Sequence, residues 1–185
     1  MTLYDNFLTP KIIDNALPQT YADEIEELLY SNRFAWYYTD NLTTKDIRRS
    51  GFYHEYYRLG TIHSNHYNFI KIIPHIVTNK ADIKQKFDIM IARSFLHTPN
   101  AANLDFVPDG IHIDTPDPHI VCLYYVNTSD GPTRIYGTSK TDLEVMSIEP
   151  VKNRAVLFNG QIYHSSTSPK KDQRAIINFN LRYDT

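Results

Sequence analysis

The sequence predicts an α+β protein, mainly β, in which helices come first and a mostly antiparallel double sheet follows. Two observations support this fold class. The N-terminal part contains two stretches in which apolar residues recur at helical spacing. From Phe87 onward the chain consists of short runs rich in Ile, Val, Leu, Phe and Tyr, separated by polar turns, which is typical of a β-sandwich or barrel.

The first helix is predicted over residues 17–34, with Pro18 at its start and Thr20 as its N-cap. A second helix is predicted over residues 65–77 and should break or kink at Pro74. The apolar positions that recur in the first helix should form its buried face; they are Ala22, Ile25, Leu28 and Leu29.

The segment between the helices, residues 34–60, is aromatic and polar without a clear period, so we expect short strands and loops there. Strands should follow after the second helix, separated by turn-like stretches such as residues 98–110. The six strand-like runs are residues 87–98, 119–127, 133–137, 143–150, 153–160 and 174–183.

The bulk composition fits one globular domain of 185 residues, with 42% hydrophobic and 22% charged residues. A formal net charge of −2 gives no indication of a nucleic-acid partner. Cys122 is the single cysteine and cannot form an internal disulfide, which favours a cytoplasmic setting. No secretory leader is recognisable, and no stretch approaches the roughly twenty apolar residues that span a bilayer, so no membrane partner is expected. The oligomeric state cannot be predicted.

A candidate metal site begins with the sequence His112-Ile113-Asp114. Residues i and i+2 of an extended strand point to the same face, about 7 Å apart, so the imidazole and the carboxylate can share one metal ion. Alone this pair is weak evidence, because a turn aspartate beside a surface histidine is common. His164 follows fifty residues after Asp114, beyond several predicted strands. Two histidines and one carboxylate on one face form the arrangement that binds Fe(II) and leaves positions open.

Arg174 lies ten residues after His164, at the start of the next predicted strand. A buried guanidinium needs a planar anionic partner, and a carboxylate bound through two hydrogen bonds is the best one. A closed zinc site would need a fourth protein ligand, most often Cys, and Cys122 lies inside an apolar run instead.

Taken in order, these residues resemble the Fe(II)/2-oxoglutarate-dependent dioxygenases, in particular the prolyl-4-hydroxylase-like branch and its phage and bacterial relatives. The matching pattern covers residues 89–181, about half of the chain. It consists of His112 and Asp114, the strand LYYVN, the turn DGPTRIYG, the strand RAVLFNG that leads to His164, and Arg174.

The resemblance implies a double-stranded β-helix, or jelly roll, over residues 87–185, with residues 1–86 as an N-terminal helical and aromatic support region of the same domain. It also implies the cytoplasm of a bacterium, or of a host cell for a phage-encoded chain. The turn departs from the family pattern, because Pro132 follows its glycine and the tryptophan that some relatives carry before it is absent. These departures concern the subfamily and the substrate.

The resemblance assigns a role to each matching residue. His112, Asp114 and His164 would bind Fe(II), and Arg174 would bind the distal carboxylate of 2-oxoglutarate. Tyr125, the second tyrosine of LYYVN, would donate a hydrogen bond to that carboxylate, or else pack in the core as strand tyrosines commonly do. The implied reaction decarboxylates 2-oxoglutarate to succinate and CO2 and hydroxylates an unactivated C–H bond, with ascorbate as an optional reductant.

Neighbouring polar residues have more than one interpretation. Asp109, Asp117 and His119 are expected in a turn or at the rim. Asp117 and His119 should face either solvent or the back of the metal ligands. Tyr124 should alternate into the core, and Arg93 should face either the pocket or the surface. The aromatic segment 34–57 should either pack in the core or frame the substrate entrance, and its members are Trp36, Tyr37, Tyr38, Tyr53, Tyr56 and Tyr57.

The prime substrate stays open between a peptide or protein, with a prolyl residue favoured by the resemblance, and a free small molecule. Two other functions are also compatible with the sequence. One is a jelly-roll module that binds a metal or an anion without turnover, such as a sensor or a virion-associated domain. The other is a zinc-dependent, cupin-like isomerase or hydrolase, in which Arg174 would lack an obvious role.

Overall fold

The computed structural model describes residues 6–42, 49–100 and 109–183. Strands predominate in the structure, and all of its helices lie before residue 81. In chain order they are β1 (Lys11–Ile13), α1 (Gln19–Tyr30), β2 (Tyr37–Thr39), β3 (Gly51–Arg58), β4 (Thr61–Ile62), α2 (Tyr67–Ile70), α3 (Ile73–Lys80), β5 (Phe87–His97), β6 (Ile120–Tyr125), β7 (Thr133–Ile135), β8 (Met146–Ile148), β9 (Arg154–Asn159), β10 (His164–Ser165) and β11 (Arg174–Tyr183).

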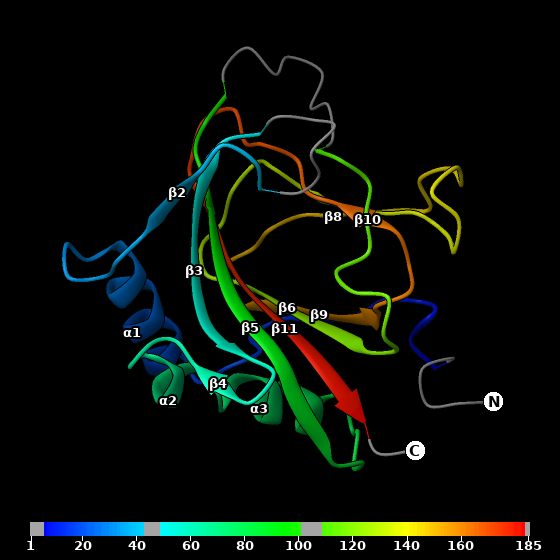
Figure 1. Cartoon of the computed structure of the whole chain (residues 1–185), viewed down its shortest axis with the longest axis horizontal. Helices are drawn as coiled ribbons and strands as arrows, with labels where there is room; N and C mark the ends of the chain where they lie inside the picture. Colours follow the sequence, from blue (N-terminus) through cyan, green and yellow to red (C-terminus); the bar gives the residue numbers. More distant parts are fainter. Residues whose placement is uncertain (1–5, 43–48, 101–108, 184–185) are drawn as a thin grey trace.

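The strands form two antiparallel sheets. The large sheet has the order β1-β9-β6-β11-β5-β3-β2, with β4 paired to β3, and the small sheet has the order β10-β7-β8. Figure 1 shows the small sheet facing the β6 and β9 part of the large sheet, while the three helices cover the opposite face. The predicted fold class, mainly β with helices first and an antiparallel double sheet, is therefore confirmed.

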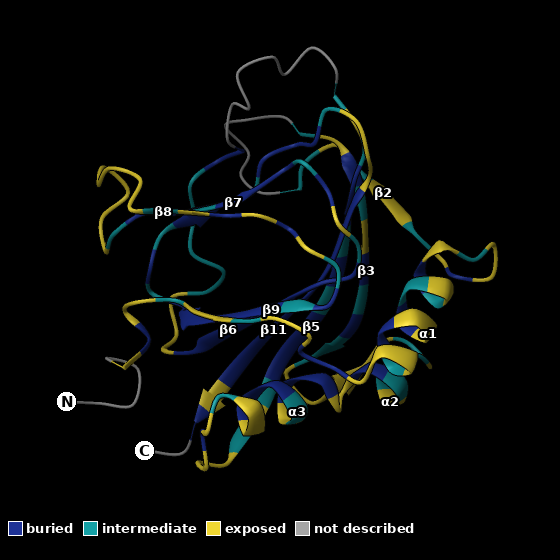
Figure 2. Cartoon of the chain, turned by 180° about the vertical axis from the view of Figure 1, so that it is seen from behind, coloured by how far each residue is buried: buried dark blue, intermediate teal, exposed yellow. Residues whose placement is uncertain are grey.

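Strand β6 shows why two cores form. All six of its residues are buried, and alternate side chains enter different hydrophobic clusters. Ile120, Cys122 and Tyr124 pack with the helices, whereas Val121, Leu123 and Tyr125 pack between the two sheets. Figure 2 shows the same double coverage as dark blue ribbon along β6, β9 and β11. The central strands therefore separate the helix-side core from the space between the two sheets.

Helix α1 confirms the predicted helix but not its predicted cap. Pro18 is the N-cap, its carbonyl accepts the N–H of Ala22 at 3.0 Å, and no side chain caps the end. Thr20 lies inside the first turn, so the prediction that it caps the helix is wrong. Ala22, Ile25 and Leu29 are buried as expected, and Leu28 packs half-buried against the same core.

The second predicted helix is divided into α2 and α3, and the break falls before Pro74 rather than at it. Pro74 lies in the first turn of α3, where its missing N–H has no helical partner to lose.

Among the described residues, no helix is long and apolar enough to cross a bilayer.

All six predicted strands are present, and residues 34–60 contain β2 and β3, as expected. The strands that were not predicted are β1, β4 and β10, each of three residues or fewer. Strands β1 to β4, from the first 86 residues, extend the large sheet. The predicted turn over residues 98–110 lies largely outside the described residues.

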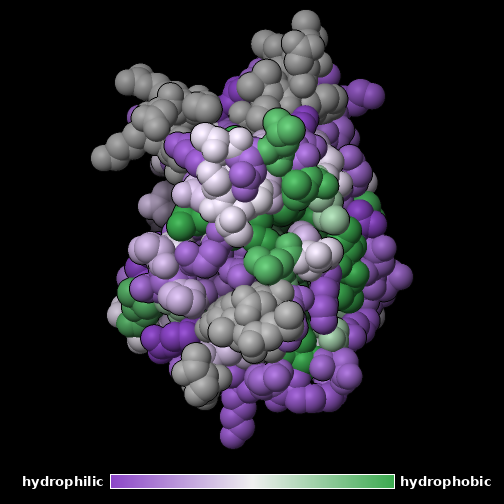
Figure 3. Space-filling model, turned by 90° about the vertical axis from the view of Figure 1, so that its right-hand side faces the viewer, coloured by the Kyte–Doolittle hydropathy of each residue, from purple (hydrophilic) through white to green (hydrophobic). Residues whose placement is uncertain are grey.

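The surface retains some exposed apolar residues in the long β7–β8 connection. Leu143 and Val145 are 86% and 67% exposed. Figure 3 looks at the side of the molecule from which this connection projects, and apolar side chains gather across the middle of that face. Leu143 and Val145 belong to neither of the two hydrophobic cores.

Candidate active site

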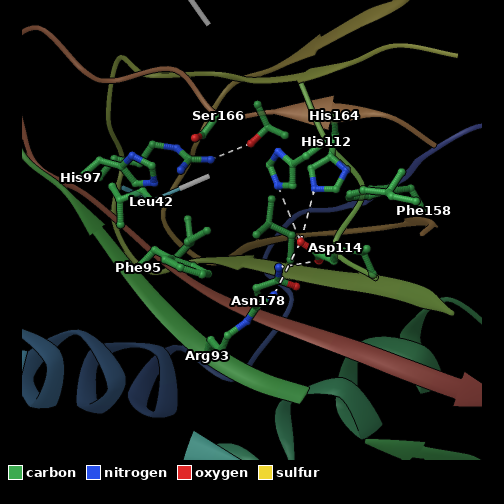
Figure 4. A pocket seen from close by; sticks show the side chains of 16 residues that line it. Leu42, Arg93, Phe95, His97, His112, Asp114, Phe158, His164, Ser166 and Asn178 are labelled. Atoms are coloured by element: carbon green, nitrogen blue, oxygen red, sulfur yellow. Dashed lines mark hydrogen bonds and ion pairs between the residues drawn. The ribbon is translucent and has the colours of Figure 1, made fainter. Parts of the chain in front are cut away.

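Two segments bring His112, Asp114 and His164 together: the stretch before β6 and strand β10. The backbones of His112 and His164 form an isolated antiparallel bridge with two hydrogen bonds of 3.0 Å. Asp114 Oδ1 lies 3.7 Å from His112 Nε2 and 3.9 Å from His164 Nε2. One potential ligand atom from each residue falls within 4.8 Å of the others. Figure 4 shows the two imidazoles and the carboxylate pointing at one another, an arrangement that can hold one metal ion.

Both imidazoles are oriented by backbone carbonyls. His112 Nδ1 lies 2.8 Å from the carbonyl of Gly110, and His164 Nδ1 lies 3.2 Å from the carbonyl of Ile162. Because a carbonyl can only accept, each Nδ1 carries the proton and donates it. The lone pair of each Nε2 is therefore directed towards Asp114, which is how metal-binding histidines are commonly prepared.

The carboxylate of Asp114 is held by two amides of β11. Its Oδ2 accepts hydrogen bonds from Asn178 Nδ2 at 2.9 Å and Asn180 Nδ2 at 2.7 Å, and the side chain is 5% exposed. Burial alone would raise the pKa of Asp114, but Arg93, the two histidines and Asn180 outweigh it and hold that pKa far below its usual range. Asp114 is thus a carboxylate at any ordinary pH, with Oδ1 left to face a metal.

Replacing Asn178 or Asn180 with alanine should weaken metal binding about tenfold to a hundredfold, as loss of a group that orients a ligand usually does. Each substitution removes one of the two donors to Asp114 Oδ2 and lets the carboxylate rotate. Anaerobic Fe(II) titration measures the change, and Asn68→Ala, an exposed amide, is the matched control. Wild-type affinity in the Asn178→Ala, Asn180→Ala double variant would contradict this role.

His164 is neutral in the folded protein at neutral pH. Burial, helped by the charge of His112, lowers the pKa of His164 to about 4. The unfolded side chain binds its proton near pH 6.5, so the metal-free protein should lose stability as the pH falls from about 6.5 towards 4.

Between pH 7 and pH 5 this loss should reach about 2 kcal/mol for the metal-free protein. The free energy of urea unfolding at the two pH values measures it, with His164→Gln as the comparison because it removes the titrating group. The variant should lose less stability over the same interval. An equal loss in both proteins would show that His164 does not protonate differently in the two states.

A cavity of about 300 Å³ connects the triad to Arg174. Arg174 is 1% exposed, and its Nη2 donates to Thr133 Oγ1 at 2.7 Å. Its Nε and Nη1 have no hydrogen-bond partner among the described residues. Buried donors without acceptors are costly, so this end of the cavity is built to receive an anion. The apolar part of the lining includes Phe95, Val121, Leu123, Phe158 and Ile176.

No family model and no curated protein matches this chain. Solved structures do. A 2OG-Fe(II) oxygenase family protein from Burkholderia pseudomallei superposes with a TM-score of 0.73 at 9% identity, over 93% of this chain and 84% of that one. The chain has the fold of the 2OG-Fe(II) oxygenases. The viral collagen prolyl hydroxylase of Paramecium Bursaria Chlorella virus-1, solved as a 2OG complex, gives 0.64 at 14% identity over 98% and 99% of the two chains.

The prolyl hydroxylase of Trichoplax adhaerens, in complex with a hypoxia inducible factor peptide fragment, also gives a TM-score of 0.64. Its identity is 17%, over 95% of this chain and 84% of that one. At such identities the likeness establishes the oxygenase fold, and the chemistry has to be argued from this chain's own residues.

Tyr125 lies behind Arg174, at the end of the cavity opposite the triad. It is fully buried, its hydroxyl donates to Thr133 Oγ1 at 2.7 Å, and the guanidinium carbon of Arg174 lies 5.6 Å from its ring centre. Thr133, which lines the cavity, accepts from both neighbours and so keeps its own hydroxyl hydrogen for a ligand. Sequence reasoning named Tyr125 and missed Thr133.

Tyr125→Phe should weaken 2-oxoglutarate binding about threefold to tenfold, because it removes one hydrogen bond that orients Thr133. Fe(II) binding should not change, since the triad lies at the other end of the cavity. Calorimetric titration of 2-oxoglutarate into the metal-loaded protein measures the effect, with Tyr124→Phe as the control because that ring packs in the other core. A loss greater than a hundredfold would mean that Tyr125 binds the cosubstrate directly.

The expectation that Asp109 lies in a turn at the rim is wrong, because the residue is buried. Asp109 is 1% exposed, accepts a hydrogen bond from Ser166 Oγ at 2.6 Å and lies 3.0 Å from Arg49 Nε. His97 Nδ1 approaches it to 3.7 Å. Burial raises the pKa of Asp109, and the charge of Arg174 is among the interactions that oppose this rise. Asp109 is a buried counter-charge behind the anion-receiving end.

His119 is fully buried, so the solvent-facing alternative is wrong for it, whereas Asp117 is exposed. The His119 ring packs on Gly160, where a Cβ atom would come within 2.1 Å of Nε2. Tyr124 belongs to the helix-side core, as expected.

The aromatic segment is divided between the core, as one expectation had it, and an exposed row of rings. Tyr56 is fully buried in the helix-side core, whereas Tyr37 and Tyr53 are 56% and 37% exposed. Tyr37 pairs with Tyr53 and Tyr53 with Phe95, so these three share one face of the sheet. Phe95 lines the cavity, and the row therefore leads from the cavity to the sheet edge.

Proposed function

We propose that the chain is an Fe(II)- and 2-oxoglutarate-dependent dioxygenase that hydroxylates an unactivated C–H bond and releases succinate and CO2. One observation carries the proposal: a facial set of two imidazoles and one carboxylate lies at one end of a buried cavity, and a guanidinium with unpaired donors lies at the other. A dicarboxylate that binds a metal through one end and a cation through the other fits this arrangement.

The residues of the site would bind the metal and 2-oxoglutarate and would exclude water. His112, Asp114 and His164 would bind the iron through three positions and leave the others open. Arg174 and the hydroxyl of Thr133 would bind the distal carboxylate of 2-oxoglutarate. The apolar lining between them keeps water from the reacting groups and strengthens each charged contact. The bound iron would supply the oxygen activation and C–H cleavage that no side chain can perform.

The prime substrate is proposed to be a small molecule or a peptide or protein segment. The prolyl hydroxylases among the structural neighbours, one of them in complex with a peptide, support testing prolyl peptides early. Ascorbate belongs in these assays as a reductant.

Formation of succinate tests the proposal. Protein reconstituted with Fe(II) should convert 2-oxoglutarate to succinate in air, slowly without a prime substrate and faster with one. The reaction should depend on Fe(II) and should be absent when Zn(II) replaces it. Binding of metal and 2-oxoglutarate without any succinate would identify a binding module instead, and turnover with Zn(II) alone would identify a zinc enzyme.

A further inference from the structure

The cavity contains a second guanidinium, Arg93, which the proposed function does not use. Arg93 lies on β5 opposite Asn178, and its side chain is 18% exposed. Arg174 lies four residues away along the same ladder, opposite His97, so the backbone positions of the two arginines are about 13 Å apart along the strands. Figure 4 shows Arg93 rising from the cavity floor towards Asp114, well away from His97.

Arg93 is held in place by an aromatic ring and by one carboxylate. Its guanidinium carbon lies 5.3 Å from the ring centre of Phe95, and Nη2 lies 3.6 Å from Asp114 Oδ1. Its Nε is buried and has no hydrogen-bond partner among the described residues. Glu55 lies opposite Arg93 on β3 but pairs with Arg58, whose Nε donates to it at 2.8 Å.

Among the described residues, Asp114 is the carboxylate within ion-pair distance of Arg93, and metal binding would take up its charge. Asp114 Oδ1 is the oxygen that faces the two histidines, so a metal held there takes the same negative charge. The described Asp, Glu, Lys and Arg residues that line the cavity are Arg93, Arg174 and Asp114. In the loaded site Asp114 and one carboxylate of 2-oxoglutarate would balance the charge of the metal, and the other carboxylate would balance Arg174. Among the described charged residues that line the cavity, Arg93 would then be left without a compensating charge, which is costly for a guanidinium that is mostly buried.

We propose that Arg93 binds a carboxylate of the prime substrate, so that the substrate is an acid whose reacting carbon lies a few bonds from that carboxylate. This inference rests on the proposed function and narrows its substrate class. A guanidinium with a free Nε presents two adjacent donors, the geometry that a carboxylate matches with two hydrogen bonds. The position of Arg93 beside Asp114 would place the bound acid next to the metal.

The test measures binding rather than turnover. Protein saturated with Mn(II) and 2-oxoglutarate under nitrogen is titrated calorimetrically with matched acid and amide pairs. These are N-acetylproline and N-acetylprolinamide, N-acetylglycine and its amide, and a short proline peptide with a free or an amidated C-terminus. The saturating 2-oxoglutarate keeps the probes away from Arg174. The peptide pair and the amino-acid pairs separate a chain terminus from a small free acid as the source of the carboxylate.

The acid of at least one pair should bind wild type tenfold or more tightly than its amide, and Arg93→Gln should abolish that preference. Arg93→Lys, which keeps the charge but not the planar fork, should retain part of it. The proposal is overturned by the absence of any acid preference at millimolar concentrations in all pairs, or by a preference that survives in Arg93→Gln.

Mn(II) and 2-oxoglutarate affinities, measured first, separate this inference from the proposed function. Failure of wild type to bind either one overturns the proposed function itself. Normal binding of both without an acid preference overturns only the role of Arg93. A loss of Mn(II) affinity beyond about threefold in both Arg93 variants would assign Arg93 to positioning Asp114 and would also overturn the substrate role.

Discussion

Replacing His164 with alanine should weaken Fe(II) binding at least about a hundredfold. His164 supplies one of the three inward-facing ligand atoms of the triad, and its Nε2 is already oriented by the carbonyl of Ile162. A structural metal bound by four protein ligands contributes about 10–16 kcal/mol, so one of three ligands should account for several kcal/mol, with each 1.4 kcal/mol changing the affinity tenfold. Anaerobic Fe(II) titration measures the change.

His63→Ala is the matched control, because His63 is an exposed histidine whose ring nitrogen lies 3.7 Å from Glu55 and outside the triad. It should bind Fe(II) as wild type does. His164→Gln keeps more of the buried volume, so it separates loss of the ligand from loss of packing. Wild-type Fe(II) affinity in both His164 variants would show that the metal, if bound, lies elsewhere.

Replacing Arg174 with methionine should weaken 2-oxoglutarate binding about a hundredfold or more while Fe(II) binding changes little. Charge-assisted hydrogen bonds contribute about 1.5–3 kcal/mol each, and two unpaired donors of Arg174 are ready to make them. Methionine is unbranched and fills the site without leaving a buried charge. Calorimetric titration of 2-oxoglutarate into the Mn(II)-loaded protein measures the loss.

Arg174→Lys should fall between wild type and methionine, because an ammonium keeps the charge but cannot present the planar fork. Arg182→Gln changes an exposed arginine on the same strand and should have no effect. Unchanged 2-oxoglutarate affinity in Arg174→Met would show that Arg174 does not bind the distal carboxylate. A parallel loss of Fe(II) affinity would instead indicate that the variant disturbs the whole cavity.

The long strands of the large sheet, such as β5, β6 and β11, could be predicted because each is an apolar run bounded by turns. The strands that were missed have three residues or fewer, and two of them, β1 and β10, form only by pairing with partners far away in the sequence. β10, for example, pairs with β7 some thirty residues earlier. The error at Thr20 is local, because its preference for capping yields to the entry of the chain at Pro18.

Most residues of the candidate site could be recognised in the sequence, and one could not. His112, Asp114, His164 and Arg174 stand out by type and spacing. Thr133 could not be recognised, because its importance depends on how β7 packs over Arg174.

Asn178 and Asn180 did leave a pattern in the sequence. They are two polar residues with period two in the otherwise apolar middle of β11, and such a pair indicates one polar face towards a site. Asp109 was misplaced because its partners, Arg49 and Ser166, lie far away in the sequence. Local composition indicated a turn, and tertiary structure buried the carboxylate.

The most direct test of the central claim is the anaerobic visible spectrum of the protein with Fe(II) and 2-oxoglutarate. A metal held by His112, Asp114 and His164, with 2-oxoglutarate bound to it, should produce a weak charge-transfer band that saturates at one cosubstrate per chain. The band should be absent in His164→Ala and should require far more 2-oxoglutarate in Arg174→Met. No band with the wild-type protein, or a band that survives in His164→Ala, would contradict the proposed site.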